Sequence, residues 1–145
     1  MAGKLRLRVI TPESVKLDEP CDMVIMRCTT GDMGILPRHE ACSAILDYGV
    51  LRIINHGEKE LHMAVFGGIV QVLDDEVTML TNEAQWPEDI DRTLAEIEHE
   101  QAEKRLQEAE DDVEIQKQQV SLRRTLVQIE VSAYPLLNAG ESDKK

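Results

Sequence analysis

The chain has 145 residues, enough for one ordinary domain or two small ones, and 42% of them are hydrophobic, so a sizeable core is expected. Aromatic residues make up only 3%, so that core must consist of aliphatic side chains and methionine. The formal net charge of -12 argues against nucleic-acid binding and against direct attachment to an anionic membrane, since both need a basic surface.

Short segments of alternating apolar and polar residues fill the first half of the chain. The first is clear from Leu5, Leu7 and Val9, which alternate with arginines as in a strand with one buried face. Further strands are expected within Val15–Leu17, Met23–Cys28, Cys42–Leu46, Val50–Ile54, Leu61–Val65, Ile69–Leu73 and Val77–Thr81. This spacing predicts an all-β domain of about nine or ten strands, an antiparallel sandwich or flattened barrel.

One stretch of this domain has unusual backbone chemistry. Gly31 and Gly34 permit sharp turns and Pro37 stiffens the exit, so we expect a loop of fixed shape over residues 31–39. Asp32 and His39 resemble an acid–base pair, but no nucleophile or metal partner accompanies them. The alternatives are a turn with a polar histidine and a loop that displays both side chains to a protein partner. A second glycine pair, Gly67–Gly68, indicates a bulge or a close backbone approach.

The composition changes at Trp86–Pro87, which we take as the boundary between a β-domain of residues 1–86 and a helical domain of residues 87–135. Pro87 suits a first helical position, and no glycine or proline follows until after Tyr134. Apolar residues recur at near-helical spacing in two series separated by an acidic cluster. We expect a helical hairpin turning at Asp111–Asp112, with one continuous helix as the competitor. Pro135 should end the second helix and leave residues 136–145 as a disordered tail.

The second helix is locally basic. Between residues 115 and 134 the sequence has three cations, Lys117, Arg123 and Arg124, and one acid, Glu130. Three interpretations of the two arginines remain open. They lie on a solvated helix face, they bind an acidic protein partner, or they bind the phosphates of a nucleotide.

Other chemistry is not indicated. The chain has no phosphate-binding glycine loop, no HExxH, no paired CxxC and no GxSxG, so we expect no catalytic residue, metal or cofactor. No apolar run approaches the roughly 20 residues of a membrane span, and the N-terminus lacks the apolar core of a signal peptide. Reduced, buried thiols of a cytoplasmic protein are expected at Cys21, Cys28 and Cys42. Exposed histidines are expected at His56, His62 and His99.

The loop gives a more specific indication. Residues 31–39, GDMGILPRH, resemble the G-x-x-G-x-x-P-x-H signature of the epsilon subunit of bacterial F-type ATP synthases. Residues 67–72, GGIVQV, resemble the family's second glycine motif, and the resemblance extends from about Lys4 to Tyr134.

The resemblance implies a non-catalytic rotor subunit of the central stalk, at the cytoplasmic face of the cell membrane and peripheral to it as part of the complex. Its β-domain would bind the gamma subunit and the c-ring through residues matching the motif: Gly31, Asp32, Gly34, Pro37 and His39. Its helices would move between a compact hairpin and a form extended along gamma. In the extended form Arg123 and Arg124 would contact an acidic loop of the beta subunit and inhibit ATP hydrolysis.

Two positions depart from the family pattern. Ala41 stands where a proline often follows the motif histidine, so a less rigid loop exit is expected. Some members bind ATP through an I/L-D-x-x-R-A motif, but here Leu94 replaces the arginine, leaving Asp91 as the remaining nucleotide ligand. The rival functions are thus an ATP-sensing module at the hairpin and an unrelated β-sandwich adaptor with a coiled-coil handle.

Overall fold

The computed structural model describes the backbone of residues 4–142 and the side chains of residues 4–134. The chain divides into two compact units, Met1–Gln85 and Trp86–Lys145. The boundary lies one residue before the one expected from the sequence, because Trp86 belongs to the helical unit.

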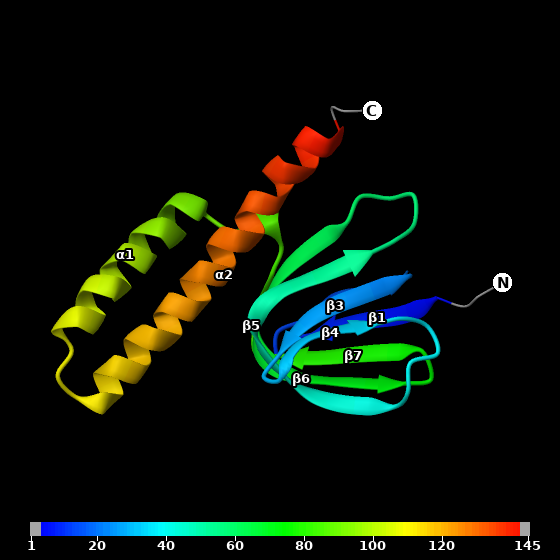
Figure 1. The fold of residues 1–145 in the computed structure, drawn as a ribbon, viewed down its shortest axis with the longest axis horizontal. Helices are drawn as coiled ribbons and strands as arrows, with labels where there is room; N and C mark the ends of the chain where they lie inside the picture. Colours follow the sequence, from blue (N-terminus) through cyan, green and yellow to red (C-terminus); the bar gives the residue numbers. More distant parts are fainter. Residues whose placement is uncertain (1–3, 143–145) are drawn as a thin grey trace. The chain divides into compact units, whose positions relative to one another are not determined.

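The first unit is all-β, as predicted, and its described part forms an eight-stranded sheet (Figure 1). The strands are β1 Leu5–Ile10, β2 Val15–Cys21, β3 Met23–Cys28, β4 Gly31–Ile35, β5 Cys42–Ile54, β6 Leu61–Leu73, β7 Glu76–Thr81 and β8 Ala84–Gln85. The expectation of nine or ten strands is wrong because expected neighbours merge: Leu61–Val65 and Ile69–Leu73 join in β6, and Cys42–Leu46 and Val50–Ile54 join in β5, where the Asp47–Gly49 segment does not turn. β5 and β6 are each 13 residues long and remain paired beyond this segment, so the chain stays extended.

The strand order is β2-β1-β7-β6-β5-β3-β4, with β8 paired to β6. All pairs are antiparallel except β1 with β7, which is parallel, so the prediction of a wholly antiparallel domain is wrong at that pair. The long β5 and β6 curve, and the sheet folds over on itself as a sandwich (Figure 1). Its core is aliphatic and sulfur-containing, as the low aromatic content requires; members with no exposed surface include Leu5, Leu7, Val9, Val24, Ile35, Met63, Val70, Val77 and Met79.

The Gly67–Gly68 pair lies where β6 changes partner. Residues 68–73 pair with β7, whereas Ala64 and Val65 pair with β8. The φ angles of Gly67 and Gly68 are 76° and 125°, and a Cβ on Gly68 would lie 2.1 Å from the Leu80 carbonyl oxygen. The predicted close backbone approach is therefore confirmed, and only glycine permits it.

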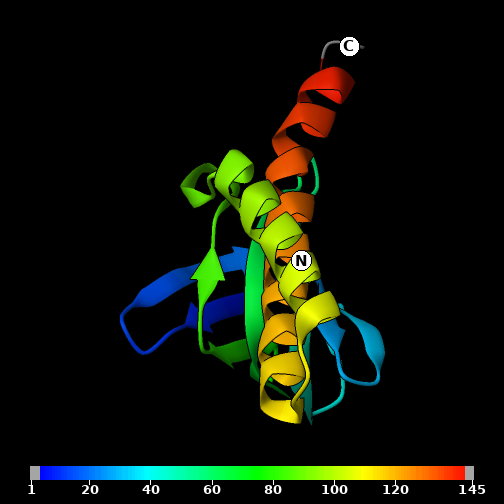
Figure 2. The ribbon, with the colours of Figure 1, turned by 90° about the vertical axis from the view of Figure 1, so that its left-hand side faces the viewer.

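The second unit is a helical hairpin, which confirms the prediction over a continuous helix (Figure 2). A 3-10 turn, η1 Pro87–Asp89, precedes α1 Arg92–Glu108 and α2 Asp112–Ser142. Asp91 caps α1 by accepting a hydrogen bond from the Leu94 N–H at 3.1 Å, and Asp111 caps α2 by accepting from the Glu114 N–H at 2.8 Å. Two aspartate caps therefore define the helix starts, and Pro87 belongs to η1 instead of α1.

α2 continues through Pro135 and ends at Ser142, so the expected end at Pro135 is wrong. Residues 136–142, expected to be disordered, are helical, and residues 143–145 lie outside the described part. A proline inside a helix lacks one backbone N–H donor and its ring clashes with the carbonyl four residues back, so a helix continues beyond it only at a cost.

Candidate functional site

Glycine is needed at the two positions of the predicted loop, Gly31 and Gly34, for different structural reasons. Residues 31–35 form β4, so the loop proper is shorter than expected and covers residues 36–41. Gly31 has φ 122° at the turn between β3 and β4, a conformation that other residues rarely adopt. A Cβ on Gly34 would lie 3.1 Å from the Met23 methyl group, so this glycine allows close packing of the hairpin.

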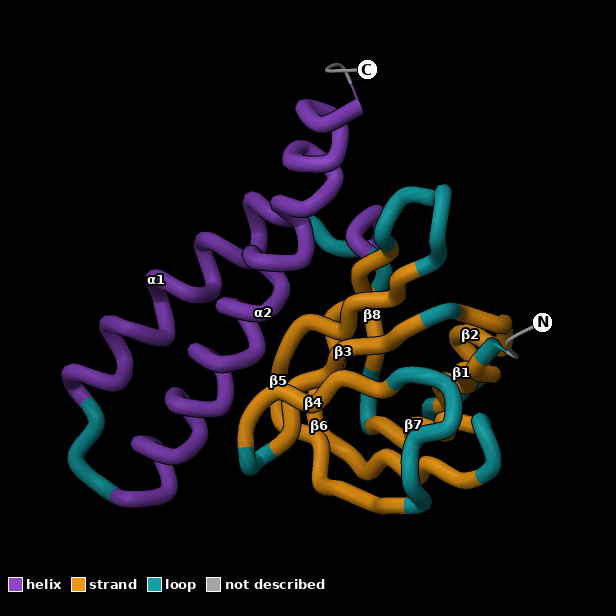
Figure 3. Tube along the Cα trace, turned by 45° about the vertical axis from the view of Figure 1, so that its right-hand side comes forward, coloured by secondary structure: helices purple, strands orange, loops and turns teal. Residues whose placement is uncertain are grey.

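Residues 36–39 form a tight turn. The Leu36 carbonyl accepts a hydrogen bond from the His39 N–H at 3.2 Å, with Pro37 second in the turn and Arg38 third. Arg38 has φ 70°, as the third residue of a type II turn does, although glycine is preferred there. Its N–H donates to Asp75 Oδ1 at 2.6 Å, and Asp75 belongs to the β6–β7 turn that lies beside this loop (Figure 3). A neighbouring turn therefore holds the loop in shape.

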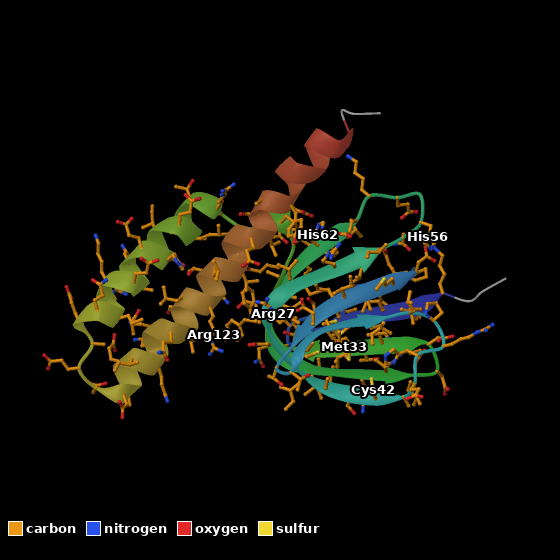
Figure 4. All side chains as sticks on the ribbon, viewed as in Figure 1. Arg27, Met33, Cys42, His56, His62 and Arg123 are labelled. Atoms are coloured by element: carbon orange, nitrogen blue, oxygen red, sulfur yellow. The ribbon has the colours of Figure 1, made fainter. Side chains whose placement is uncertain are left out.

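Asp32 and His39 have separate partners. Asp32 lies opposite Arg27 in the β3–β4 pair, with Oδ1 3.6 Å from Arg27 Nε, and both side chains are exposed. Arg27 is labelled in Figure 4. His39 Nδ1 lies 2.8 Å from the Glu40 carbonyl oxygen and 3.9 Å from Cys42 Sγ. These contacts leave the acid–base interpretation without geometric support. The role of Asp32 and His39 in partner binding remains a prediction.

The expected exposure of His62 is wrong, whereas His56 is exposed as predicted. His62 lies within β6, with Nε2 2.5 Å from Glu60 Oε2, and Arg52 donates to both oxygens of Glu60 at 3.0 and 2.8 Å. Burial lowers the pKa of His62, and the hydrogen bonds from Arg52 lower the pKa of Glu60. The cluster joins neighbouring strands, since Arg52 faces His62 across the β5–β6 pair.

The free cysteines follow the prediction in part. Cys21 and Cys28 are buried, and burial raises the pKa of both thiols. Cys42 is only partly buried, because it lies at the start of β5 directly after the loop (Figure 4).

The structure reveals a surface that the sequence analysis missed. In the strand register, Ile10 pairs with Val15 on one side and Leu80 on the other, Leu80 pairs with Ile69, and Ile69 pairs with Ile45. Paired residues project on the same face of a sheet. Five aliphatic side chains thus form one row across β2, β1, β7, β6 and β5, which we call the apolar row: Val15, Ile10, Leu80, Ile69 and Ile45. Ile10 is partly exposed and the other four are exposed.

In the helical unit, the two arginines predicted to act together point in different directions. Arg123 and Arg124 are consecutive, so they point about 100° apart around α2. Arg124 lines an open groove of about 370 Å³ between α1 and α2, together with Arg105, which the sequence analysis did not single out. Asp91 is engaged as the cap of α1, so its position in the sequence has a sufficient structural explanation.

His99 also differs from its prediction as an exposed residue. It is half-buried, because it faces Thr125 of α2 within the hairpin. Among the residues that the structure describes, no cluster of metal-binding side chains is found. None of the helices in residues 4–142 combines the length and the apolar character that crossing a bilayer requires.

Comparisons with known proteins match both units. The model for the ATP synthase Delta/Epsilon chain beta-sandwich domain covers residues 4–87, and the model for the long alpha-helix domain of the same chain covers residues 88–133. The chain is 37% identical over 129 residues to the ATP synthase epsilon chain of Halalkalibacterium halodurans, covering 88% of this chain and 96% of that one. The epsilon chain of Bacillus licheniformis is 36% identical over 128 residues, covering 88% and 97%.

A solved structure gives the same answer. A chain of the Euglena gracilis mitochondrial ATP synthase, in an assembly of OSCP, F1 and c-ring, superposes with a TM-score of 0.79 at 26% identity, covering 90% of this chain and 81% of that one. The matches define a non-catalytic stalk subunit built from a β-sandwich and a helical pair. This chain belongs to the epsilon chain family of ATP synthases. Membership of this family excludes the rival interpretation of the chain as an unrelated β-sandwich adaptor.

Proposed function

We propose that the chain is the rotor subunit that couples ion-driven rotation of the c-ring to the catalytic head, with its β-sandwich docked on the gamma subunit. The apolar row is the observation that carries this proposal. The net charge of -12 makes an exposed line of five uncharged aliphatic side chains unusual for this surface. Such a line favours a protein partner that removes it from water.

The surroundings of the apolar row have the character of an interface rim. The next register line on the same face of the sheet, two residues along each strand, is polar, because Thr78 pairs with Gln71 and Gln71 with Ser43. On the same line, Arg8 pairs with Thr78, and Arg8 Nη2 lies 3.0 Å from Glu76 Oε2. An apolar centre bordered by polar and charged groups is typical of specific protein interfaces.

We propose that the loop of residues 36–41 and the β6–β7 turn contact the c-ring. Leu36 and Leu73 are exposed there, and the hydrogen bond from Arg38 to Asp75 joins the two segments. A preformed loop loses little conformational entropy on binding. In this proposal Gly31, Gly34 and Pro37 shape the loop region, while Asp32 and His39 are displayed to the partners.

The test is reconstitution with an ATP synthase lacking this chain. The full chain should co-purify with gamma and restore ion-driven ATP synthesis in vesicles. A fragment of residues 1–86 should do the same if the sandwich alone carries coupling, with its folding checked by circular dichroism. A folded fragment that joins gamma but leaves synthesis at the level of the depleted enzyme would contradict the coupling role. The proposed location is the cytoplasmic face of the membrane, held there through the complex.

We also propose that the helices inhibit ATP hydrolysis by moving to an acidic loop of the beta subunit, with Arg123 and Arg124 making the contact. The support is the locally basic stretch of α2 between residues 115 and 134, and a short hairpin turn at which the Asp111 cap begins α2. Arg123→Glu combined with Arg124→Glu should raise ATP hydrolysis by the reconstituted enzyme. Lys117→Glu is the matched control, since Lys117 is an exposed cation on the same helix. Hydrolysis that rises equally with the control would count against a specific contact.

Nucleotide sensing is the second candidate, and the groove lined by Arg105 and Arg124 is the observation that favours it. Two guanidinium groups suit phosphate oxygens. A third is missing, because Leu94 stands where the I/L-D-x-x-R-A motif has its arginine. Isothermal titration of the chain with ATP tests this candidate, with Arg105→Ala as the disrupting variant and Lys104→Ala as the control. Binding that is millimolar or weaker, with no melting shift, would exclude sensing at cellular ATP concentrations.

A further inference from the structure

Residues 36–41, which we call the β4–β5 connection, have few contacts that fix them to the sandwich. β4 is an edge strand, since within the described part of the chain it pairs with β3 alone. The backbone hydrogen bond from His39 to Leu36 is local to the connection. Among the described residues, the bond from the Arg38 N–H to Asp75 Oδ1 at 2.6 Å is the one hydrogen bond that joins the connection to a part of the chain outside β4 and β5.

The backbone of Arg38 depends on this bond. At φ 70° Arg38 is in the left-handed region, which costs free energy for a residue with a Cβ and little for glycine. The Asp75 carboxylate offsets this cost, because it accepts a charge-assisted hydrogen bond from the Arg38 N–H. The shape of the turn at residues 36–39 is therefore set in part by a residue of a different turn.

Asp75 is itself fixed in place. It lies in the two-residue turn between β6 and β7, whose flanking residues Leu73 and Glu76 pair with each other. Asp74 and Asp75 have φ angles of 49° and 63°, both positive as in a type I′ turn. The Asp75 carbonyl also accepts a hydrogen bond from the Arg6 N–H of β1 at 2.8 Å. One residue thus links the β4–β5 connection to the β6–β7 turn and to β1 (Figure 3).

We propose that Asp75 is a positioning residue for rotor coupling. It fixes the β4–β5 connection, our proposed surface for the c-ring, to the strands that carry the apolar row, our proposed surface for gamma. β1, β6 and β7 each contribute a side chain to that row. A connection held in its bound shape loses less conformational entropy on binding than one that must first be ordered. The proposal rests on the docking proposed above and adds the residue that joins the two surfaces.

The neighbouring aspartate provides a matched control. Asp74→Ala and Asp75→Ala both place alanine at a positive φ in the same turn, so they should lower the melting temperature by similar amounts. The bond to Arg38 comes from Asp75, so Asp75→Ala alone should release the connection. Asp75→Asn keeps an oxygen that accepts the bond and tolerates a positive φ, so it should restore most of what alanine removes.

Two measurements on the full chain test the proposal. By NMR, the amides of Arg38 and His39 should exchange about tenfold faster in Asp75→Ala, as expected for loss of one exposed charge-assisted hydrogen bond, and at the natural rate in Asp74→Ala. The concentration of chain that half-restores ion-driven ATP synthesis to the depleted enzyme should rise about tenfold in Asp75→Ala for the same reason. It should change little in Asp74→Ala and in Asp75→Asn.

A second variant makes the test specific to the backbone of Arg38. Arg38→Gly removes the cost of the positive φ, so adding Asp75→Ala to it should change the half-restoring concentration much less than Asp75→Ala does in the natural chain. Equal effects of the two alanine variants, or faster exchange in Asp75→Ala without any change in that concentration, would overturn the positioning role while the coupling stands. A natural chain that does not restore synthesis would instead refute the proposed coupling itself.

Discussion

Ile69 lies in the middle of the apolar row, with Leu80 and Ile45 as its register partners on either side. Its side chain is 46% exposed, against 45% for Leu80 and 60% for Ile45. Fully burying an isoleucine or leucine side chain contributes roughly 1.5–3 kcal/mol. About half of each remains to be buried by a partner, so each contributes roughly 1 kcal/mol to binding.

Ile69→Ala should therefore weaken binding to the gamma subunit about fivefold, since about 1.4 kcal/mol corresponds to a tenfold change in affinity. Replacing Ile45, Ile69 and Leu80 together by alanine should weaken it on the order of a hundredfold, the sum of three such losses, with coupling between these paired neighbours setting the departure from that sum. Isothermal titration with purified gamma measures both. The fold of each variant is checked by thermal melting, which should change little because these side chains lie outside the core.

Leu61→Ala is the matched control. Leu61 is an exposed aliphatic residue of the same strand, 40% exposed and outside the apolar row. Its truncation should leave the affinity for gamma unchanged. If the triple variant binds gamma as tightly as the natural chain, or if Leu61→Ala weakens binding as much as Ile69→Ala, the apolar row is not the gamma surface.

Three further predictions concern stability. Gly68→Ala should destabilise the β-unit by roughly 3 kcal/mol in denaturant unfolding, because it adds a clash to an unfavourable φ, whereas Gly57→Ala, with positive φ but open space around it, should cost about 1 kcal/mol; equal losses would refute the role of the close approach. The lowered pKa of His62 stabilises the fold above the ordinary histidine pKa of about 6.5, and this contribution is lost as the pH falls through the folded-state value. The melting temperature of His62→Gln should accordingly fall less between pH 7.5 and 5 than that of the natural chain, and parallel pH curves would contradict this. Asp91→Ala should remove about 1 kcal/mol of helix stability whether or not ATP is present, as loss of a cap does; a loss seen only with ATP would restore Asp91 as a nucleotide ligand.

Local patterns predicted much of the fold. Alternation at Leu5, Leu7 and Val9 correctly predicted the first strand. The acidic cluster that follows Glu108 and interrupts the apolar spacing correctly predicted the hairpin turn. These features depend on residues near one another in the chain. The merging of two expected strands into β5 was not predictable in the same way, because it depends on β6 being long enough to pair along its whole length.

The apolar row shows the limit most clearly. Ile69 and Val70 are both apolar, so alternation does not say which of them faces the core. The answer depends on pairing with β5 and β7, and on the break at Gly67–Gly68, which is where β6 changes partner. His62 was misjudged for a related reason, since its burial and its contact with Glu60 come from tertiary structure and not from its place beside a turn.

The loop was predicted in kind but not in detail. Glycine, proline and histidine spacing indicated a fixed shape, and the turn at Leu36–His39 has one. The bond that holds it, from Arg38 to Asp75, joins residues 37 positions apart and has no local signal. Whether Ala41 loosens the exit stays a prediction.

The most direct test of the central proposal is site-specific photo-crosslinking in the assembled ATP synthase. A photoreactive residue at position 69 should form its main product with the gamma subunit, and one at position 61 should give little of it. One at position 36 should link to a c subunit. A chain that assembles normally but links through position 69 to subunits other than gamma, or links to gamma equally from both positions, would contradict the proposed docking of the sandwich.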